Sequence, residues 1–101
     1  MFIYNITTKV TWTIHDEWIE WMKEIHTLEV VNTGCFTNVT ILRLLDIDEN
    51  EGPTYAVQYL AESKALYNRY IEKFAPTFRQ ELFDKWGDNF IAFRSLMQVV
   101  N

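Results

Sequence analysis

Residues 2–12 read Phe2-Ile3-Tyr4-Asn5-Ile6-Thr7-Thr8-Lys9-Val10-Thr11-Trp12. Large apolar side chains occupy most of the even positions, whereas most of the odd positions are polar. An alternation with a period of two, rich in β-branched and aromatic residues, is typical of a β-strand with one buried face. We therefore predict a strand over residues 2–12, for which the rest of the chain supplies partners.

A helical pattern follows this strand. Thr13 and Asp16 fit a capping box at a helix start, and Gly34 suits the left-handed residue that often follows a helix end. From Ile14 onwards the apolar positions fall within one arc of a helical wheel. These positions are Trp18, Trp21, Met22, Ile25 and Leu28. The pattern predicts a first helix that buries this stripe.

The middle of the chain has the pattern of a β-hairpin. Residues 36–47 are strand-like, residues 48–53 form a polar segment that contains Gly and Pro, and residues 54–61 alternate again. Two strands that are joined by a short polar connection typically pair antiparallel.

A second helix and a last strand complete the order. Ser63 is a good helix cap, and Gly87 a good helix end. Pro76 falls within the helical run and lacks an amide proton. We therefore expect either a kink or two consecutive helices, with Pro76 opening the second. Residues 89–100 are again apolar and strand-like, which predicts a final strand.

The predicted order is β-α-β-β-α-β, which is the ferredoxin-like arrangement of the α+β class. It places two helices on one face of a four-stranded antiparallel sheet, in a single domain over residues 1–101. Several strands carry apolar groups on both faces, so one face would stay exposed in a monomer. We therefore expect a homodimer in which two sheets pack face to face.

Composition excludes several classes of function. The formal net charge is −5, and no cluster of Lys and Arg is present, which disfavours nucleic acids and anionic membrane surfaces as partners. No apolar run is long enough to span a bilayer, and the start of the chain lacks the pattern of a signal peptide. Cys35 is the only cysteine, so an intramolecular disulfide cannot form. We expect a cytoplasmic protein.

Segments along nearly the whole chain together resemble a known family. They are Ile3-Tyr4-Asn5, then Trp18, Trp21-Met22 and His26 on one helix, Thr33-Gly34-Cys35-Phe36, Tyr55-Ala56-Val57-Gln58-Tyr59, Ala75-Pro76 with Arg79, and Gly87-Asp88-Asn89-Phe90-Ile91-Ala92-Phe93-Arg94. This combination is similar to that of short, stand-alone bacterial proteins known only as a domain of unknown function. Members typically read His-Ile-Pro where this chain has His26-Thr27-Leu28, so we expect the first helix to continue here.

That family looks like a branch of the dimeric α/β barrel superfamily. The superfamily includes cofactor-free monooxygenases, haem-degrading monooxygenases, small isomerases and proteins with no known chemistry. The resemblance therefore implies a fold and a homodimer, but it supplies neither an activity nor a catalytic residue.

Six residues are candidates for a ligand site: Asn5, Trp18, Met22, His26, Gln58 and Arg94. His26 lies at the margin of the apolar stripe, either as a histidine held by one hydrogen bond or as an acid–base group with a pKa near neutrality. Asn5 and Gln58 either make structural hydrogen bonds or anchor a ligand. Arg94 either pairs with an acid or captures an anionic ligand. The acids considered for Arg94 are Asp46, Glu62 and Asp88.

Aromatic residues and histidines outside this set have simpler interpretations. Five aromatic side chains form either a box around a ligand or a core, and a core is the simpler interpretation. They are Trp18, Trp21, Tyr55, Tyr59 and Tyr70. We expect His15 to be a solvated surface residue. His15 and His26 are separated by roughly 16 Å of helical rise, so they cannot share one metal ion. We predict no metal site and no cofactor.

The functional prediction is a small homodimeric binding or interaction module that holds an apolar or aromatic molecule between helices and sheet. The alternative is a cofactor-independent oxygenase or isomerase that acts on an apolar or phenolic substrate. In that enzyme His26 would move a proton, while Asn5 and Arg94 would stabilise negative charge. A third hypothesis is haem binding with His26 as the axial ligand. The sequence leaves open whether the protein is an enzyme.

Overall fold

Four strands form one antiparallel sheet in the computed structural model, which describes residues 1–101. The strands are β1 (Phe2–Val10), β2 (Asn38–Arg43), β3 (Thr54–Ala61) and β4 (Phe90–Gln98). They lie in the order β2-β3-β1-β4, and every neighbouring pair is antiparallel. The central strands β1 and β3 are therefore paired on both sides, whereas β2 and β4 are the edges.

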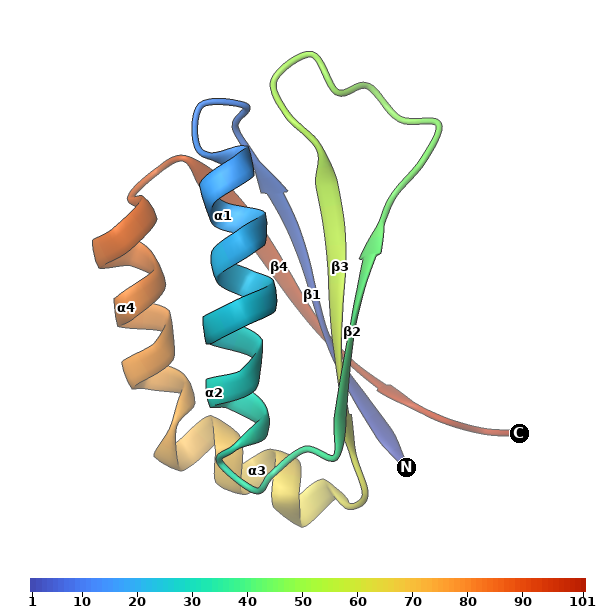
Figure 1. The fold of residues 1–101 in the computed structure, drawn as a ribbon. Coiled ribbons are helices and arrows are strands. Elements are labelled where there is room, and N and C mark those ends of the chain that lie inside the picture. The colour runs from blue at the N-terminus through green and yellow to red at the C-terminus, as the bar shows by residue number, and fades with distance from the viewer.

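The helices all lie on one face of this sheet (Figure 1). The first helical stretch is continuous and consists of α1 (His15–Trp21), a π-helical segment η1 (Met22–His26) and α2 (Thr27–Val31). The second consists of α3 (Lys64–Lys73) and α4 (Ala75–Trp86). The opposite face of the sheet carries no helix (Figure 1). No helix is long and apolar enough to cross a membrane.

Most of the predicted elements are present with shifted ends. The third strand has the predicted bounds, 54–61. The first strand ends at Val10, and the second extends only over Asn38–Arg43, because the neighbouring residues form connections and not sheet pairs. The prediction that the first helix continues past His26 is confirmed by α2.

Of three predictions made for the ends of helices, two are confirmed and one is wrong. The hydroxyl oxygen of Ser63 accepts a hydrogen bond from the backbone N–H of Leu66, as expected of a cap. Pro76 lies in the first turn of α4, where its missing N–H costs nothing. The capping box at Thr13 and Asp16 is wrong, because Ile14 is the N-cap residue and makes no side-chain cap bond.

The core lies between the sheet and the helices and is largely aromatic. Every second residue of β3 is buried on this side. Among these residues, Tyr59 packs against Tyr4 and Phe36 at ring-centroid distances of 6.3 and 5.3 Å. Trp18, Tyr55 and Tyr70 belong to the same cluster and Trp21 packs against it, so these aromatic residues form a core as the simpler interpretation predicted.

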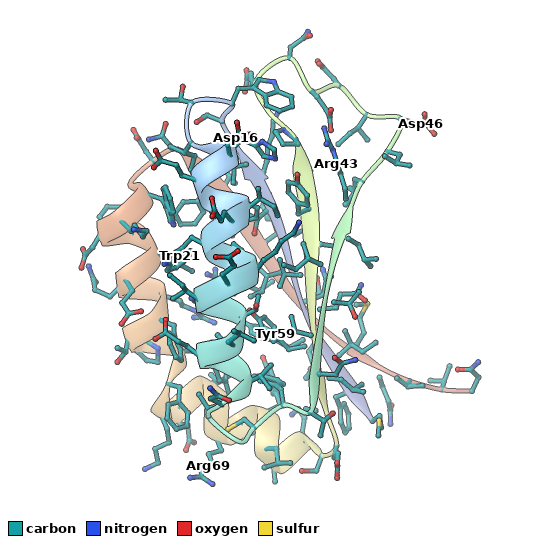
Figure 2. The ribbon with its side chains drawn as sticks, viewed as in Figure 1. Asp16, Trp21, Arg43, Asp46, Tyr59 and Arg69 are labelled. Carbon is teal, nitrogen blue, oxygen red and sulfur yellow. The ribbon has the colours of Figure 1, made fainter.

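Tyr59 offers a test of this packing. Figure 2 shows Tyr59 between the first helix and the sheet, where its hydroxyl is fully buried and has no hydrogen-bond partner. Burial raises the pKa of the Tyr59 hydroxyl, so the group stays neutral. An unpartnered buried hydroxyl costs about 1–3 kcal/mol. We therefore expect Tyr59→Phe to raise the free energy of unfolding by about 1 kcal/mol in urea titrations; a lower value would mean that the hydroxyl has a partner.

Candidate functional site

The π-helical segment η1 determines which side of the first helix faces the sheet. Ile14, Trp18, Met22, His26 and Val30 recur every four residues. On a regular helix of 3.6 residues per turn, this spacing drifts by about 40° at each step. A π turn contains one more residue than an α turn, so η1 offsets the drift. As a result, Trp18, Met22, His26 and Val30 are all buried.

Hydrogen bonds stabilise the wide turn. The backbone N–H and the hydroxyl of Thr27 both donate to the carbonyl oxygen of Met22, the hydroxyl at 2.7 Å. His26 and Thr27 therefore face inward, whereas Ile25 and Leu28 are 48% and 52% exposed. The expectation that Ile25 and Leu28 belong to the buried stripe is wrong, because the helical-wheel argument assumed regular turns.

His26 lies at the end of η1 and is only 3% exposed. Its ring stacks on Trp21 at a centroid distance of 4.8 Å and meets the ring of Phe78 edge-on at 5.6 Å. Its Nδ1 atom has no hydrogen-bond partner. Burial lowers the pKa of His26 to about 4, so the ring is neutral near pH 7. Neither the expected hydrogen bond nor the expected pKa near neutrality is found.

A small cavity between the helices and the sheet brings four of the candidates together. It is lined by Trp18, Met22, His26 and Arg94, together with apolar residues and Thr8. Its volume is about 20 Å³. This is enough for one water molecule, whereas a cavity of roughly 150 Å³ holds a benzene ring. An aromatic ligand does not fit here, and neither does a haem with His26 as its axial ligand.

Asn5 and Gln58 lie on the opposite face of the sheet from His26. They are direct neighbours across β1 and β3, and the Gln58 side-chain amide donates to Asn5 Oδ1 at 3.3 Å. Asn5 Nδ2 in turn donates to Thr7 Oγ1 at 3.0 Å. The three residues to which the enzyme hypothesis assigned chemistry, His26, Asn5 and Arg94, are therefore divided by the sheet.

Asn5 and Gln58 belong to a polar row that crosses the whole sheet. Thr40 is paired with Gln58 in register, Gln58 with Asn5, and Asn5 with Ser95. The neighbouring row on one side is apolar at Leu60, Ile3 and Met97. The row on the other side contains Leu42, Ala56, Thr7 and Phe93.

The open face of the sheet is large and almost uncharged. Its residues are Ile3, Asn5, Thr7 and Lys9 from β1, Asn38, Thr40 and Leu42 from β2, Thr54, Ala56, Gln58 and Leu60 from β3, and Ile91, Phe93, Ser95 and Met97 from β4. Lys9 is the only charged residue among them, and it pairs with Glu51. Phe93 is 69% exposed although it is one of the largest apolar side chains of the chain. Exposed apolar side chains that gather on one face are typical of interaction surfaces.

Arg94 points toward the helices, since it lines the cavity with His26. Lys9 pairs with Glu51 and Arg43 with Glu49, whereas Arg94 takes part in no ion pair. The expected partners Asp46, Glu62 and Asp88 therefore do not hold it. Its register partner is Ile6, on the side of β1 that faces the core.

His15 has a structural role that the sequence did not indicate. Its Nε2 lies 2.7 Å from the hydroxyl of Tyr55, and its Nδ1 lies 2.9 Å from Asp16 Oδ1. The expectation of a solvated surface histidine is wrong, because His15 joins the start of α1 to β3. Tyr55 lies 40 residues further along the chain, so no local pattern could have revealed the contact.

No three His, Cys, Asp or Glu side chains lie close enough together to hold a metal ion. The family model described as a domain of unknown function, DUF4286, matches residues 1–100. No curated protein matches the chain.

Proposed function

We propose that this chain, which belongs to the DUF4286 family, a domain of unknown function, is a homodimeric interaction module. Two copies pack through the open faces of their sheets, in the manner of a dimeric α/β barrel built from ferredoxin-like subunits. The observation that carries this proposal is the open sheet face, where apolar side chains are exposed and Lys9 is the only charged residue.

The size of the open face supports a second copy as its occupant. Strands of 6 to 9 residues, at ~3.3 Å per residue and ~4.8 Å between strands, cover about 500 Å² in plan. The pleat and the side chains make the accessible area larger than this plan area. A stable protein interface buries about 800 Å² on each partner. The face therefore approaches the area that a stable dimer needs.

The pattern of rows makes the face complementary to itself. We consider a two-fold axis that lies between the facing sheets and runs parallel to the strands. This axis places each cross-strand row opposite the same row of the other copy, with the order of the strands reversed. The polar row then meets the polar row, so that Asn5 lies opposite Gln58 of the second copy. In the adjacent row Leu42 lies opposite Phe93, and apolar side chains pack together.

The amides of the polar row have hydrogen-bonding capacity left for such a partner. An Asn or Gln side chain offers two N–H donors and an oxygen with two lone pairs. Within one chain the Gln58 side chain makes a single hydrogen bond, to Asn5. A polar group that is buried without a partner costs about 1–3 kcal/mol, so the two copies are held in the register that pairs their amides.

Oligomeric state tests this proposal. In analytical ultracentrifugation we expect the protein to have a mass twice the 12.1 kDa of one chain. Phe93→Asp places a carboxylate in the proposed interface of both copies and should weaken dimerisation by at least about a hundredfold. Phe83 is the matched control, since it is 61% exposed and lies on α4, in the helical layer. Phe83→Asp should leave the dimer unchanged, and a wild-type protein that sediments as a monomer would contradict the proposal.

The proposal includes neither a small ligand in the core nor an enzyme. The cavity beside His26 measures about 20 Å³, and Asn5 lies on the other side of the sheet from His26 and Arg94. An oxygenase or isomerase that acts on a phenolic substrate would need these groups around one space large enough for a ring. The geometry therefore supports binding through the sheet over catalysis in the core.

A further inference from the structure

The outer surface of the helical layer carries a second apolar stripe, which η1 creates. Trp21, Ile25 and Leu28 follow one another along the first helical stretch, and none of them is fully buried. Because the wide turn brings His26 and Thr27 inward, Ile25 and Leu28 face solvent, and each is about half exposed. Figure 2 shows Trp21 pointing into the space between α1 and α4.

Two open hollows share Trp21 as a lining residue, and Ile25 lines one of them. One, of about 420 Å³, is lined by Trp21 and Lys85 with the carboxylates of Glu29, Glu81 and Asp84. The other, of about 210 Å³, is lined by Trp21 and Ile25 with the carboxylates of Glu17, Glu20 and Glu24. We call this surface the Trp21 groove.

The charge of the Trp21 groove is strongly negative. Lys85 is the only cationic residue that lines it, and its ammonium group lies 5.7 Å from the Trp21 ring and 5.1 Å from the Trp86 ring. A cation over an aromatic face is attracted by the ring's negative charge distribution. The groove thus already holds one cation in this way and offers carboxylates on both sides for others.

We propose that the Trp21 groove docks a cationic amphipathic helix of a partner protein. The apolar side of such a helix covers Trp21, Ile25 and Leu28, and its Lys and Arg side chains pair with the flanking carboxylates. From Glu17 to Glu29 the first helix rises by roughly 18 Å, which matches a partner helix of about 12 residues. Nucleic acids and anionic membranes are repelled by the same carboxylates.

The residues that line the groove belong to the first helical stretch and α4, and these helices cover the face of the sheet opposite the open one (Figure 1). Docking on the helices therefore does not compete with the proposed dimer, and each copy of the dimer presents its own groove. The inference does not depend on dimerisation and would hold for a monomer.

Binding of a synthetic helical peptide to the full-length protein tests the proposal. The probe is a fluorescently labelled peptide of Leu and Lys, with leucines placed to form one apolar face. The comparison peptide has the same composition with the leucines distributed around the helix. In fluorescence anisotropy titrations we expect the amphipathic probe to bind at least about tenfold more tightly than the comparison peptide, because only it buries apolar area in the groove. Equal affinities, or no binding of the probe, would overturn the proposal.

Variants locate the binding surface. Ile25→Ser combined with Leu28→Ser should weaken binding at least about tenfold, and so should Glu20→Lys combined with Glu24→Lys. All four positions are exposed, so the fold should persist, which circular dichroism checks. The matched controls are Glu72→Lys on α3 and Phe93→Ser on the open sheet face, and both should leave the affinity unchanged. Loss of binding in Phe93→Ser, or unchanged binding in the Ile25 and Leu28 variant, would place the peptide elsewhere and contradict the proposal.

Discussion

Gly52→Ala, which adds a single methyl group, is expected to destabilise the protein strongly. Gly52 has a φ of +155°, and a Cβ atom there would lie 1.7 Å from the carbonyl oxygen of Val10. The clash involves backbone that cannot move freely, because Val10 N–H donates to Pro53 O and Trp12 N–H donates to Glu51 O. We expect a loss of about 3 kcal/mol or more, seen as a melting temperature lower by at least roughly 12 °C.

Gly34→Ala is the matched control for this experiment. Gly34 also has a positive φ, +82°, but a Cβ atom there would meet no atom within 4 Å. Its substitution costs only the left-handed backbone strain, about 1–2 kcal/mol. Equal effects of the two substitutions would show that the β2–β3 connection does not press against the end of β1.

Stability should also fall as the pH decreases from about 6.5 to about 4, because of His26. Burial lowers the pKa of His26 from 6.5 to about 4 in the folded chain. In this pH window the unfolded chain binds a proton and the folded chain does not, so each decrease in pH favours unfolding. Above pH 6.5 both states are neutral and the full stability remains. This lowering of the His26 pKa corresponds to a loss of about 3 kcal/mol in the free energy of unfolding, and the loss is complete below pH 4.

Urea titrations across this pH range measure the effect, and His26→Gln separates it from the titration of the carboxylates. Gln is polar, of similar length and does not titrate. The difference in unfolding free energy between wild type and His26→Gln should change by about 3 kcal/mol between pH 7 and pH 4. A difference that is independent of pH would mean that His26 is solvated or has a partner in the folded state.

The periodicity of the chain was enough to predict the strands. Buried and half-buried side chains alternate strictly over residues 54–61, and most large apolar side chains of residues 2–10 share the face of β1 that packs against the core. Ser63 and Pro76 could be placed in advance for a similar reason, since a cap and a first-turn proline act on backbone groups within a few residues.

The candidate site could be predicted only in part. Asn5, His26, Gln58 and Arg94 are unusual in apolar surroundings, and this made each a candidate from composition alone. The sequence did not predict which of these residues lie together. The periodicity of a strand shows that two of its residues share a face, but it does not show which face the helices cover. The register now places Arg94 with His26, and Asn5 with Gln58 on the other side.

The order of helices and strands and the turn positions follow from the sequence alone, because they depend on neighbours within a few residues, and the acidic balance follows from composition. The remaining features arise only from tertiary packing. The π turn at Met22–His26 keeps a four-residue spacing of buried side chains against the sheet, and it thereby exposes Ile25 and Leu28. The contact of His15 with Tyr55 and the approach of Gly52 to Val10 likewise join segments that are distant in sequence. Which distant segments come into contact is not encoded in the pattern of either segment alone, so these contacts become visible only in the folded chain.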